Sequence, residues 1–245
     1  FFSGLVHSTR TPFPMGVLRF KSWFEATFPY AVALAVGPQE FDHVLIDMNS
    51  VIHESCERAG AEESVIAGVM DRLERLLQTA VPLKTVNISI DGPAPLGKME
   101  TQRQRRAQSK DRWFPSYRVT AGCGFLRRVE EAVQYYCCKC LQGRYPAVQF
   151  YISGASVAGE GETKLVQHVR RVCDQSKKAV HQSYCLVGPD SDLLLVALSC
   201  SWVANVYWLN ADRGMCYSVA RLCSAWLFRG KQTEAAMKSE EEEAE

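Results

Sequence analysis

The sequence has no excess charge of either sign, and none of its apolar stretches needs a membrane to explain it. Lys and Arg total 28 against 27 Asp and Glu, so the formal net charge is only +1. This excludes binding to nucleic acid through overall basicity, so such a site would need a local cluster of Lys and Arg. One uncharged stretch, 193–211, contains Ser and Asn and has a strand-like end. We therefore predict a buried helix followed by a buried strand, in a soluble protein.

The sequence also lacks a complete zinc motif, although it contains ten cysteines. Cys137 and Cys140 have C-x-x-C spacing, but no second pair of this kind and no His pair follows them. They fall at the end of a helical pattern, where structural cysteines are the simpler interpretation. We expect reduced thiols throughout the chain.

Internal repeats and low-complexity linkers are absent, which favours one large domain. Apolar spacing predicts helices over 17–28, 62–79, 98–112, 122–141, 162–173 and 192–199. Short apolar or β-branched runs predict strands over 44–46, 85–90, 148–152, 184–187 and 203–209. Strands that alternate with helices indicate an α/β fold, with a mainly parallel twisted sheet flanked by helices. We predict this domain over 15–230, between an N-terminal extension (1–14) and an acidic tail (231–245).

Acidic residues follow four of the predicted strands. The six carboxylates belong to Asp47, Asp91, Glu160, Glu162, Asp190 and Asp192. The carboxyl ends of parallel strands meet at one edge of a sheet, so we expect these side chains to converge there. Converging carboxylates repel one another unless they take up protons or bind cations. Hard divalent cations such as Mg²⁺ prefer oxygen ligands, and two such ions can catalyse hydrolysis of a phosphodiester.

Each acidic residue also has a simpler interpretation. A single Asp after a strand is often a helix cap or a turn residue, and Asp190 and Asp192 could both cap the helix over 192–199. Four strand ends that all carry acids favour the metal site. The glycines around Glu160 support it further, since they allow a ligand to approach the backbone closely.

A basic helix begins seven residues after Asp91. One face of this helix carries Lys98, Gln102, Arg105 and Arg106. Lys and Arg donors on one face suit a bound phosphate, although a solvated basic face is the alternative. His53 lies six residues after Asp47. It is either a structural residue or a residue that stacks on a nucleobase, and the residues alone leave both open.

Seven segments in this order resemble the N-terminal region of the XRN family of 5′→3′ exoribonucleases. They are Met15-Gly16-Val17, Ile46-Asp47-Met48-Asn49-Ser50-Val51-Ile52-His53, Ile90-Asp91-Gly92-Pro93-Ala94-Pro95, Lys98-Met99, Gln102-Arg103-Gln104-Arg105-Arg106, Gly159-Glu160-Gly161-Glu162-Thr163-Lys164 and Gly188-Pro189-Asp190-Ser191-Asp192-Leu193. The resemblance implies a fold like that of PIN and flap endonucleases. It also implies that the six carboxylates bind two Mg²⁺ or Mn²⁺ ions. The four residues of the basic helix would bind the 5′-monophosphate of RNA, and His53 would stack on the first base.

The resemblance leaves three functions open. The first is a 5′→3′ exoribonuclease. The second is an RNA-binding or scaffold subunit of a ribonucleoprotein assembly with weak or no catalysis, because a further metal-binding Asp and a longer C-terminal half of the family are not in this sequence. The third is a structure-specific DNA endonuclease. The family implies cytoplasm or nucleus. The acid-free stretch before Glu25, with its Ser, Thr and Arg, suits the remnant of a mitochondrial targeting region, but it suits a clipped or partly ordered terminus as well.

Overall fold

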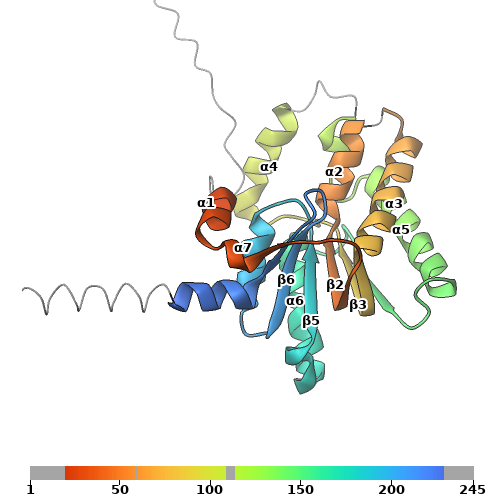
Figure 1. The fold of residues 1–245 in the computed structure, drawn as a ribbon. Coiled ribbons are helices and arrows are strands. Elements are labelled where there is room, and N and C mark those ends of the chain that lie inside the picture. Colours follow the sequence, from red (N-terminus) through yellow and green to blue (C-terminus); the bar gives the residue numbers. More distant parts are fainter. Residues whose placement is uncertain (1–19, 59, 109–113, 229–245) are drawn as a thin grey trace, which may run out of the picture.

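Seven strands form a single sheet in the order β1-β7-β6-β5-β2-β3-β4 (Figure 1). The computed structural model describes residues 20–58, 60–108 and 114–228. The strands are β1 (Val32–Leu34), β2 (Gln39–Asp47), β3 (Ala80–Ser89), β4 (Gln149–Ser153), β5 (Ser183–Val187), β6 (Asn205–Asn210) and β7 (Met215–Ser218). The helices are α1 (Phe20–Thr27), α2 (Met48–Arg58), α3 (Glu62–Thr79), α4 (Leu96–Gln108), α5 (Gly124–Gln142), α6 (Gly161–Gln175) and α7 (Asp192–Ser199). Three short 3-10 helices, η1 (Pro29–Ala31), η2 (Ser116–Arg118) and η3 (Lys177–His181), lie between them, and a helical segment follows over 219–228.

The strand order reverses at β2, which lies between β3 and β5 and runs parallel to both. From β2 the chain builds β3 and β4 on one side. It then crosses to the other side of β2 and builds β5 and β6, again in parallel. In open α/β sheets, ligands bind outside the carboxyl ends of the strands at such a reversal. The topology therefore places the predicted site beside the carboxyl end of β2.

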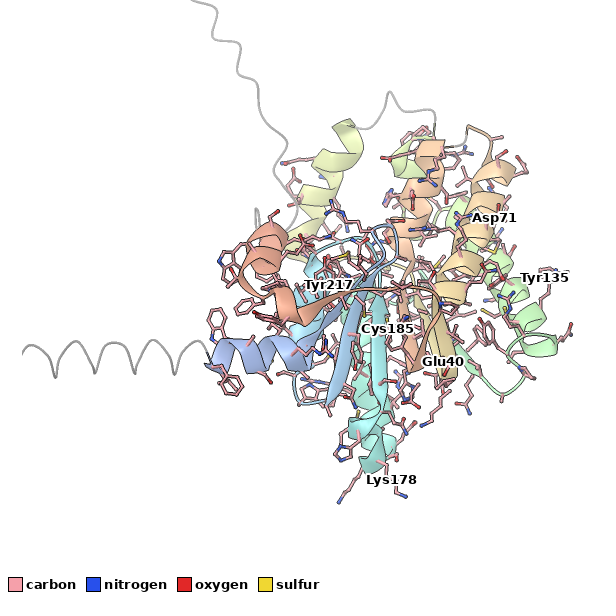
Figure 2. All side chains as sticks on the ribbon, in the orientation of Figure 1. Glu40, Asp71, Tyr135, Lys178, Cys185 and Tyr217 are labelled. Atoms are coloured by element: carbon pink, nitrogen blue, oxygen red, sulfur yellow. The ribbon has the colours of Figure 1, made fainter. Side chains whose placement is uncertain are left out.

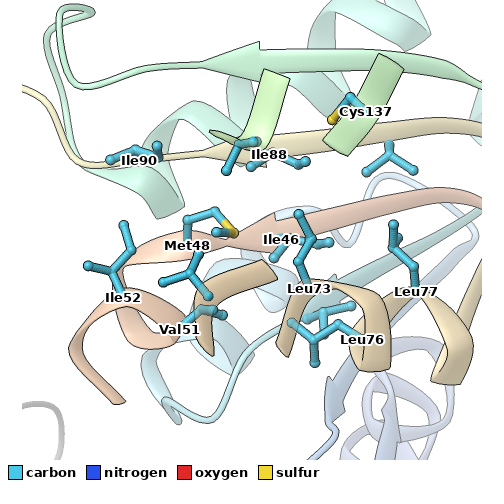
Figure 3. Close-up of a cluster of buried hydrophobic side chains, with 14 of the residues drawn as sticks. Ile46, Met48, Val51, Ile52, Leu73, Leu76, Leu77, Ile88, Ile90 and Cys137 are labelled. Atoms are coloured by element: carbon cyan, nitrogen blue, oxygen red, sulfur yellow. The ribbon is translucent and has the colours of Figure 1, made fainter. Parts of the chain in front are cut away.

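Two apolar clusters cover the two faces of the sheet. Val44 and Ile46 of β2 pack with α2, α3 and α5, whereas Leu45 packs with α1, α6, α7 and the 219–228 segment. Figure 3 shows part of the first cluster, in which Leu73 and Leu77 lie near Ile46. Burial on both faces explains why β2 reads as a continuous apolar run instead of an alternating one.

The mainly parallel α/β fold predicted from the sequence is confirmed, and the uncharged stretch 193–211 is a helix and a strand as predicted. Within the described residues, no helix is long and apolar enough to cross a membrane. All ten cysteines are free thiols, and both Cys137 and Cys140 are buried. Residues 1–19 of the acid-free stretch, the acidic tail and the ends of two predicted helices (17–19 and 109–112) lie outside the described residues.

Two strands were not predicted. β7 forms a hairpin with β6, and β1 pairs antiparallel with β7 at the edge of the sheet. The hairpin turns at Gly214, whose φ of 60° is left-handed and suits glycine. β1 and β7 have only three and four residues, which is too short to give a periodic pattern.

A line of buried polar side chains runs between the sheet and α6. Alternate residues of β3 face this helix, since the intervening residues pack with α3 and α5. We name this line the polar seam, and it consists of His43, Thr85, Asn87, Ser89, Lys164 and His168. His43 Nδ1 lies 2.8 Å from Thr85 Oγ1, and Ser89 Oγ donates to Asn87 Oδ1 at 2.9 Å. The seam is unexpected from the sequence, which predicted these β3 positions only as part of a buried strand.

His168 is expected to make the fold less stable in acid. Burial, with smaller effects from His43 and Arg171, lowers the pKa of His168 to about 4, and neither ring nitrogen has a hydrogen-bond partner among the described residues. Between pH 6.5 and 4 the unfolded chain therefore binds a proton at this residue that the folded chain does not bind. Relative to His168→Leu, the wild type should lose about 1.4 kcal/mol of unfolding free energy per pH unit in that window.

Urea unfolding at pH 7.5 and pH 5 measures this difference. His181→Leu, which replaces an exposed histidine, is the control and should follow the wild-type profile. Parallel pH profiles for the wild type and His168→Leu would contradict the prediction.

Candidate active site

The six predicted carboxylates lie on four segments that leave the same edge of the sheet. Asp47 is the last residue of β2, and Asp91 follows β3 by two residues. Glu160 and Glu162 lie at the start of α6. The remaining two, Asp190 and Asp192, lie between β5 and the first turn of α7.

Hydrogen bonds connect the first three of these segments. The amide of Asn49 donates to Asp47 Oδ1 at 3.1 Å, and the Asn49 side chain accepts from the amide of Asp91 at 3.0 Å. Asp91 Oδ1 in turn accepts from the amide of Gly161 at 2.6 Å. A Cβ atom on Gly161 would lie only 2.8 Å from Asp47 Oδ1 and 3.3 Å from Asp91 Oδ1. Two carboxylates from different strands therefore flank the same glycine.

Asp47 is the electrostatic centre of the group. Burial and the neighbouring charges of Asp91, Glu162 and Asp190 together raise its pKa to about 7, against one backbone hydrogen bond from Asn49 that lowers it. These three neighbours belong to the three other segments. Each of the three other segments therefore contributes a negative charge that acts on Asp47.

The other carboxylates repel one another in the same way. Burial raises the pKa of Asp91, and Glu160 adds to this effect. Burial also raises the pKa of Glu162, with contributions from Asp192, Glu160 and Asp190. The pKa of Asp192 is raised by burial and by Asp190. Without a cation, burial and mutual repulsion therefore disfavour the fully ionised state of this group.

This donor set fits a divalent cation. Every ligand candidate is a carboxylate oxygen, which is the donor that Mg²⁺ and Mn²⁺ prefer, and a cation would relieve the repulsion that now raises the pKa values. Within the described part of the chain, no three acidic, His or Cys side chains already surround a single cation position. Glu160 instead pairs with Lys98, whose Nζ lies 2.7 Å from Glu160 Oε2. Binding would therefore require side-chain rotation.

The basic helix is α4, and Lys98 in its first turn is close to the acidic group. Besides its ion pair, Lys98 is attracted by Glu162 and Asp91, and these contacts raise its pKa, with the hydrogen bond to Glu160 as the largest cause. Gln102 follows one turn later and is partly buried. The backbone of α4 includes Arg105 and Arg106, but their side chains lie outside the described part.

His53 lies on the exposed side of α2. Its charge acts to lower the pKa of Asp91, so the imidazole is near the acidic group and is not part of the core. The role of His53 in binding therefore stays a prediction.

The helix-cap interpretation is wrong for Asp192. The N-cap residue of α7 is Ser191, and Asp192 is the first residue of the helix. Asp190 does form a local turn, because its Oδ1 accepts from the amide of Asp192 at 3.1 Å. This turn fixes Asp190 beside Asp192, and the second carboxylate oxygen of Asp190 takes no part in that hydrogen bond.

The Gly-rich loop between β4 and α6 packs closely on the turn after β3. The amide of Gly92 donates to the carbonyl of Gly159 at 2.9 Å, and the Gly159 amide donates to the Pro93 carbonyl at 3.1 Å. A Cβ on Gly92 would overlap the carbonyl oxygen of Val157 at 1.7 Å. Only glycine at position 92 therefore permits this approach, which brings the Glu160 segment next to Asp91.

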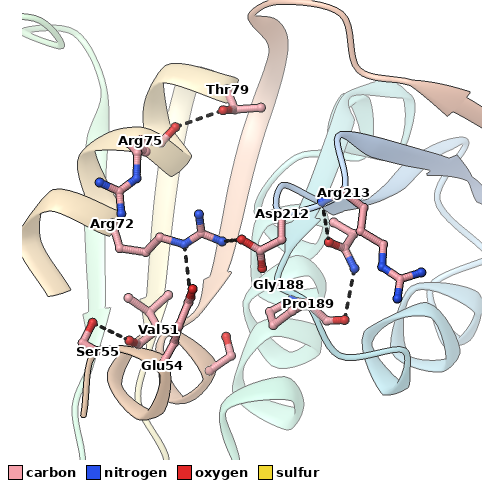
Figure 4. A network of polar contacts seen from close by, with 12 residues as sticks. Val51, Glu54, Ser55, Arg72, Arg75, Thr79, Gly188, Pro189, Asp212 and Arg213 are labelled. Carbon is pink, nitrogen blue, oxygen red and sulfur yellow. Dashed lines mark hydrogen bonds and ion pairs between the residues drawn. The ribbon is translucent and has the colours of Figure 1, made fainter. Parts of the chain in front are cut away.

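A second network supports the loop that carries Asp190 (Figure 4). Trp208 Nε1 donates to the Gly188 carbonyl at 3.0 Å, and Asn210 Nδ2 donates to the Pro189 carbonyl at 3.2 Å. Next to it, Arg72 of α3 forms ion pairs with Glu54 of α2 and with Asp212 in the β6–β7 turn. We did not predict a supporting role for these residues from the sequence, because they are far apart in the chain. Asn49 was also missed, although its position two residues after Asp47 is typical of a turn-forming side chain.

The fold and the site together define the class of protein to which this chain belongs. The chain is a doubly wound α/β protein with a carboxylate cluster at the point where the strand order reverses, and a cationic helix begins beside that cluster. A family model described as "XRN 5′-3′ exonuclease N-terminus" matches residues 15–113 and 107–209. The chain belongs to this XRN family.

Curated relatives agree with this assignment. The chain is 29% identical over 215 residues to 5′-3′ exoribonuclease 1 of Saccharomyces cerevisiae, a match that covers 76% of this chain and 14% of the yeast protein. It is 26% identical over 216 residues to 5′-3′ exoribonuclease 1 of Homo sapiens, covering 76% of this chain and 13% of the human protein. The chain thus spans about a seventh of these relatives.

Among solved structures, the catalytic core of Rad2 in complex with a DNA substrate is similar at 15% identity, with a TM-score of 0.44. That match covers 85% of this chain and 56% of the Rad2 chain. The TM-score is below 0.5, so the family assignment rests on sequence.

Proposed function

We propose that this protein is a divalent-metal-dependent 5′→3′ exoribonuclease that degrades RNA with a 5′-monophosphate. The observation that carries the proposal is the close approach of the Asp47 and Asp91 carboxylates to Gly161, at the start of the helix that carries Glu160 and Glu162. Membership of the XRN family supports the exonuclease activity. We propose further that residues 15–230 form the nuclease domain.

In this proposal the carboxylates hold two Mg²⁺ or Mn²⁺ ions. The ligands would be Asp47, Asp91, Glu160, Glu162, Asp190 and Asp192. Bound ions would supply an activated water and stabilise the leaving oxygen of the phosphodiester. The protein's own contribution is to fix the carboxylates on rigid strand ends, so that little reorganisation is needed when the charge develops.

The basic helix would bind the 5′ end of the substrate. Lys98 is already beside the acidic group, and a phosphate could replace Glu160 as its partner. Gln102, Arg105 and Arg106 follow on the same face of α4 and would supply further donors. His53 would stack on the first base.

The test compares RNA with a 5′-monophosphate and RNA with a 5′-hydroxyl, in Mg²⁺ or Mn²⁺. We expect stepwise decay of the phosphorylated RNA only. Lys98→Met should slow that decay roughly 10–100-fold, since a charge-assisted hydrogen bond contributes about 1.5–3 kcal/mol. Lys139→Met, which removes an exposed lysine from α5, is the control and should change nothing.

Equal decay of the two RNAs would contradict the role of α4. A DNA strand of the same sequence, with a 5′-phosphate, belongs in the same assay. Preference for DNA would favour the structure-specific endonuclease instead.

A second candidate is an RNA-binding subunit of a ribonucleoprotein assembly that cleaves weakly or not at all. One observation favours it: among the described residues, no three acidic, His or Cys side chains surround a single cation position. This candidate predicts salt-sensitive RNA binding without turnover. Turnover by the purified chain would exclude it.

A further inference from the structure

Lys164 is a buried lysine whose role the proposed function does not explain. It lies in the first turn of α6, two residues after Glu162, with a relative exposure of 5%. Burying an ammonium group is unfavourable unless it is hydrogen-bonded and its charge is compensated. Lys164 meets both conditions, because Nζ donates to two backbone carbonyls and the carboxylates of Asp91 and Glu130 attract its charge.

The two carbonyls belong to the ends of neighbouring strands. Nζ lies 2.7 Å from the oxygen of Ile90 and 2.9 Å from the oxygen of Gly154. The β3–β4 ladder ends at Ser89 and Ser153, followed by one bond from the Ile90 amide to the Ser153 carbonyl at 2.9 Å. The next backbone hydrogen bond between the two segments runs from the Gly92 amide to the Gly159 carbonyl. Lys164 therefore bridges β3 and β4 where their backbones stop pairing with each other.

Each bridged carbonyl leads directly to the acidic site. Ile90 immediately precedes Asp91, and Gly154 begins the loop that leads to Glu160. The start of this loop is also held from α5, because Glu130 Oε1 accepts from the amide of Ala155 at 2.5 Å. The end of the loop returns to Asp91 through the amide of Gly161. The bridge is thus the point at which both segments are fixed before they reach the site.

We propose that Lys164 is a positioning residue of the acidic site. Its ammonium holds the ends of β3 and β4 at the spacing that places Asp91 next to Glu160 and Glu162. This inference rests on the proposed metal-dependent function, since the positioned groups are the proposed ligands. Lys164 acts through the backbone and does not contact the cation.

The test measures Mn²⁺ binding to the full chain without RNA, from the electron paramagnetic resonance signal of free Mn²⁺. Lys164→Met keeps the length of the side chain but removes its donors and its charge. We expect the Kd for Mn²⁺ to rise 10–100-fold, which is the usual effect of losing a group that orients metal ligands. Lys178→Met is the matched control. It makes the same substitution on η3, beyond the carboxyl end of α6, where the lysine is exposed (Figure 2), and it should leave the Kd unchanged.

The sign of the change separates positioning from two other roles. If Lys164 acted only as a nearby positive charge, its removal would tighten Mn²⁺ binding. If it only stabilised the fold, the melting temperature would fall but the Kd of the folded protein would stay the same. Either result overturns the inference and leaves the proposed function intact. A wild-type chain that neither binds Mn²⁺ nor degrades RNA overturns both.

Lys164→Gln covers the case in which Lys164→Met does not fold. The Gln amide keeps a donor that can reach a carbonyl. The Kd of Lys164→Gln for Mn²⁺ should therefore lie between the Kd of the wild type and the higher Kd expected for Lys164→Met. A Kd equal to that of the wild type would overturn the inference.

Discussion

Asp47→Asn is expected to abolish Mg²⁺-dependent RNA decay, with a fall of roughly 1000-fold or more. Asp47 is the most buried of the proposed ligands whose pKa is raised, and negative charges from the other three acidic segments act on it. Loss of a proposed ligand there removes several kcal/mol of transition-state stabilisation, and each 1.4 kcal/mol is about tenfold in rate. Single-turnover decay of 5′-phosphorylated RNA with saturating enzyme measures the effect. Residual decay within tenfold of the wild-type rate would contradict the role of Asp47.

The same substitution should stabilise the protein when no metal is present. The folded pKa of Asp47, about 7, lies above its unfolded value of 3.8. Folded chains therefore bind more protons than unfolded chains between these values, and stability from this residue falls as pH rises from about 4 to 7. Asn cannot ionise, so in EDTA at pH 7.5 the variant should be more stable by up to about 4 kcal/mol.

Urea unfolding in EDTA at pH 5 and pH 7.5 measures this gain. His168 acts in the opposite direction between pH 6.5 and 4, so each variant must be compared with the wild type at the same pH. The control is Asp71→Asn on α3, which removes an exposed carboxylate (Figure 2). A loss of stability in Asp47→Asn at pH 7.5 would show that the carboxylate does not carry the expected electrostatic penalty.

Gly161→Ala is expected to reduce activity about 100-fold while leaving the fold intact. The new methyl group would lie 2.8 Å from Asp47 Oδ1 and 3.3 Å from Asp91 Oδ1. Both contacts are with side-chain oxygens, so the carboxylates can move without unfolding the backbone. A displacement of about 1 Å in a catalytic group can cost about 100-fold in rate. The affinity for Mn²⁺ should fall in parallel.

Gly68→Ala provides the matched control for this prediction. A methyl group at this position in α3 would lie 3.5 Å from Ser55 Oγ, an ordinary contact. Its activity should equal that of the wild type, and its stability should not decrease, since Ala favours helix over Gly. Gly161→Ala with wild-type kcat and Mn²⁺ affinity would exclude close convergence of Asp47 and Asp91.

The sequence predicted the central parallel strands β2, β3 and β5 because both of their faces are buried. Runs such as Val44 to Ile46 are continuous and apolar, and the acids that follow them mark the carboxyl edge of the sheet. Topology then brings these acids together without further information. The hairpin of β6 and β7 was not predicted because strand pairing there depends on a turn at Gly214 and on very short segments.

The supporting contacts could not be read from local patterns. The ion pair between Arg72 and Asp212 joins residues 140 positions apart, and a charged residue on a helix normally indicates a solvated surface. Lys164 would likewise be assigned to a solvated surface, since nothing in the neighbouring sequence shows that its ammonium group is buried. Such contacts follow from the tertiary fold and become visible only with coordinates.

The polar seam has a consequence for anyone who redesigns this protein for greater stability. Replacing buried polar groups with well-packed apolar ones is often neutral or stabilising, so His43, Asn87 and His168 are obvious targets. Lys164, in contrast, hydrogen-bonds from α6 to backbone carbonyls at the ends of β3 and β4, so an apolar replacement there would remove a directional contact that sets the position of the helix. Glu160 is the N-cap residue of that helix, and Glu162 lies in its first turn. A variant selected only for its melting temperature would therefore become more stable but lose the position of these two carboxylates.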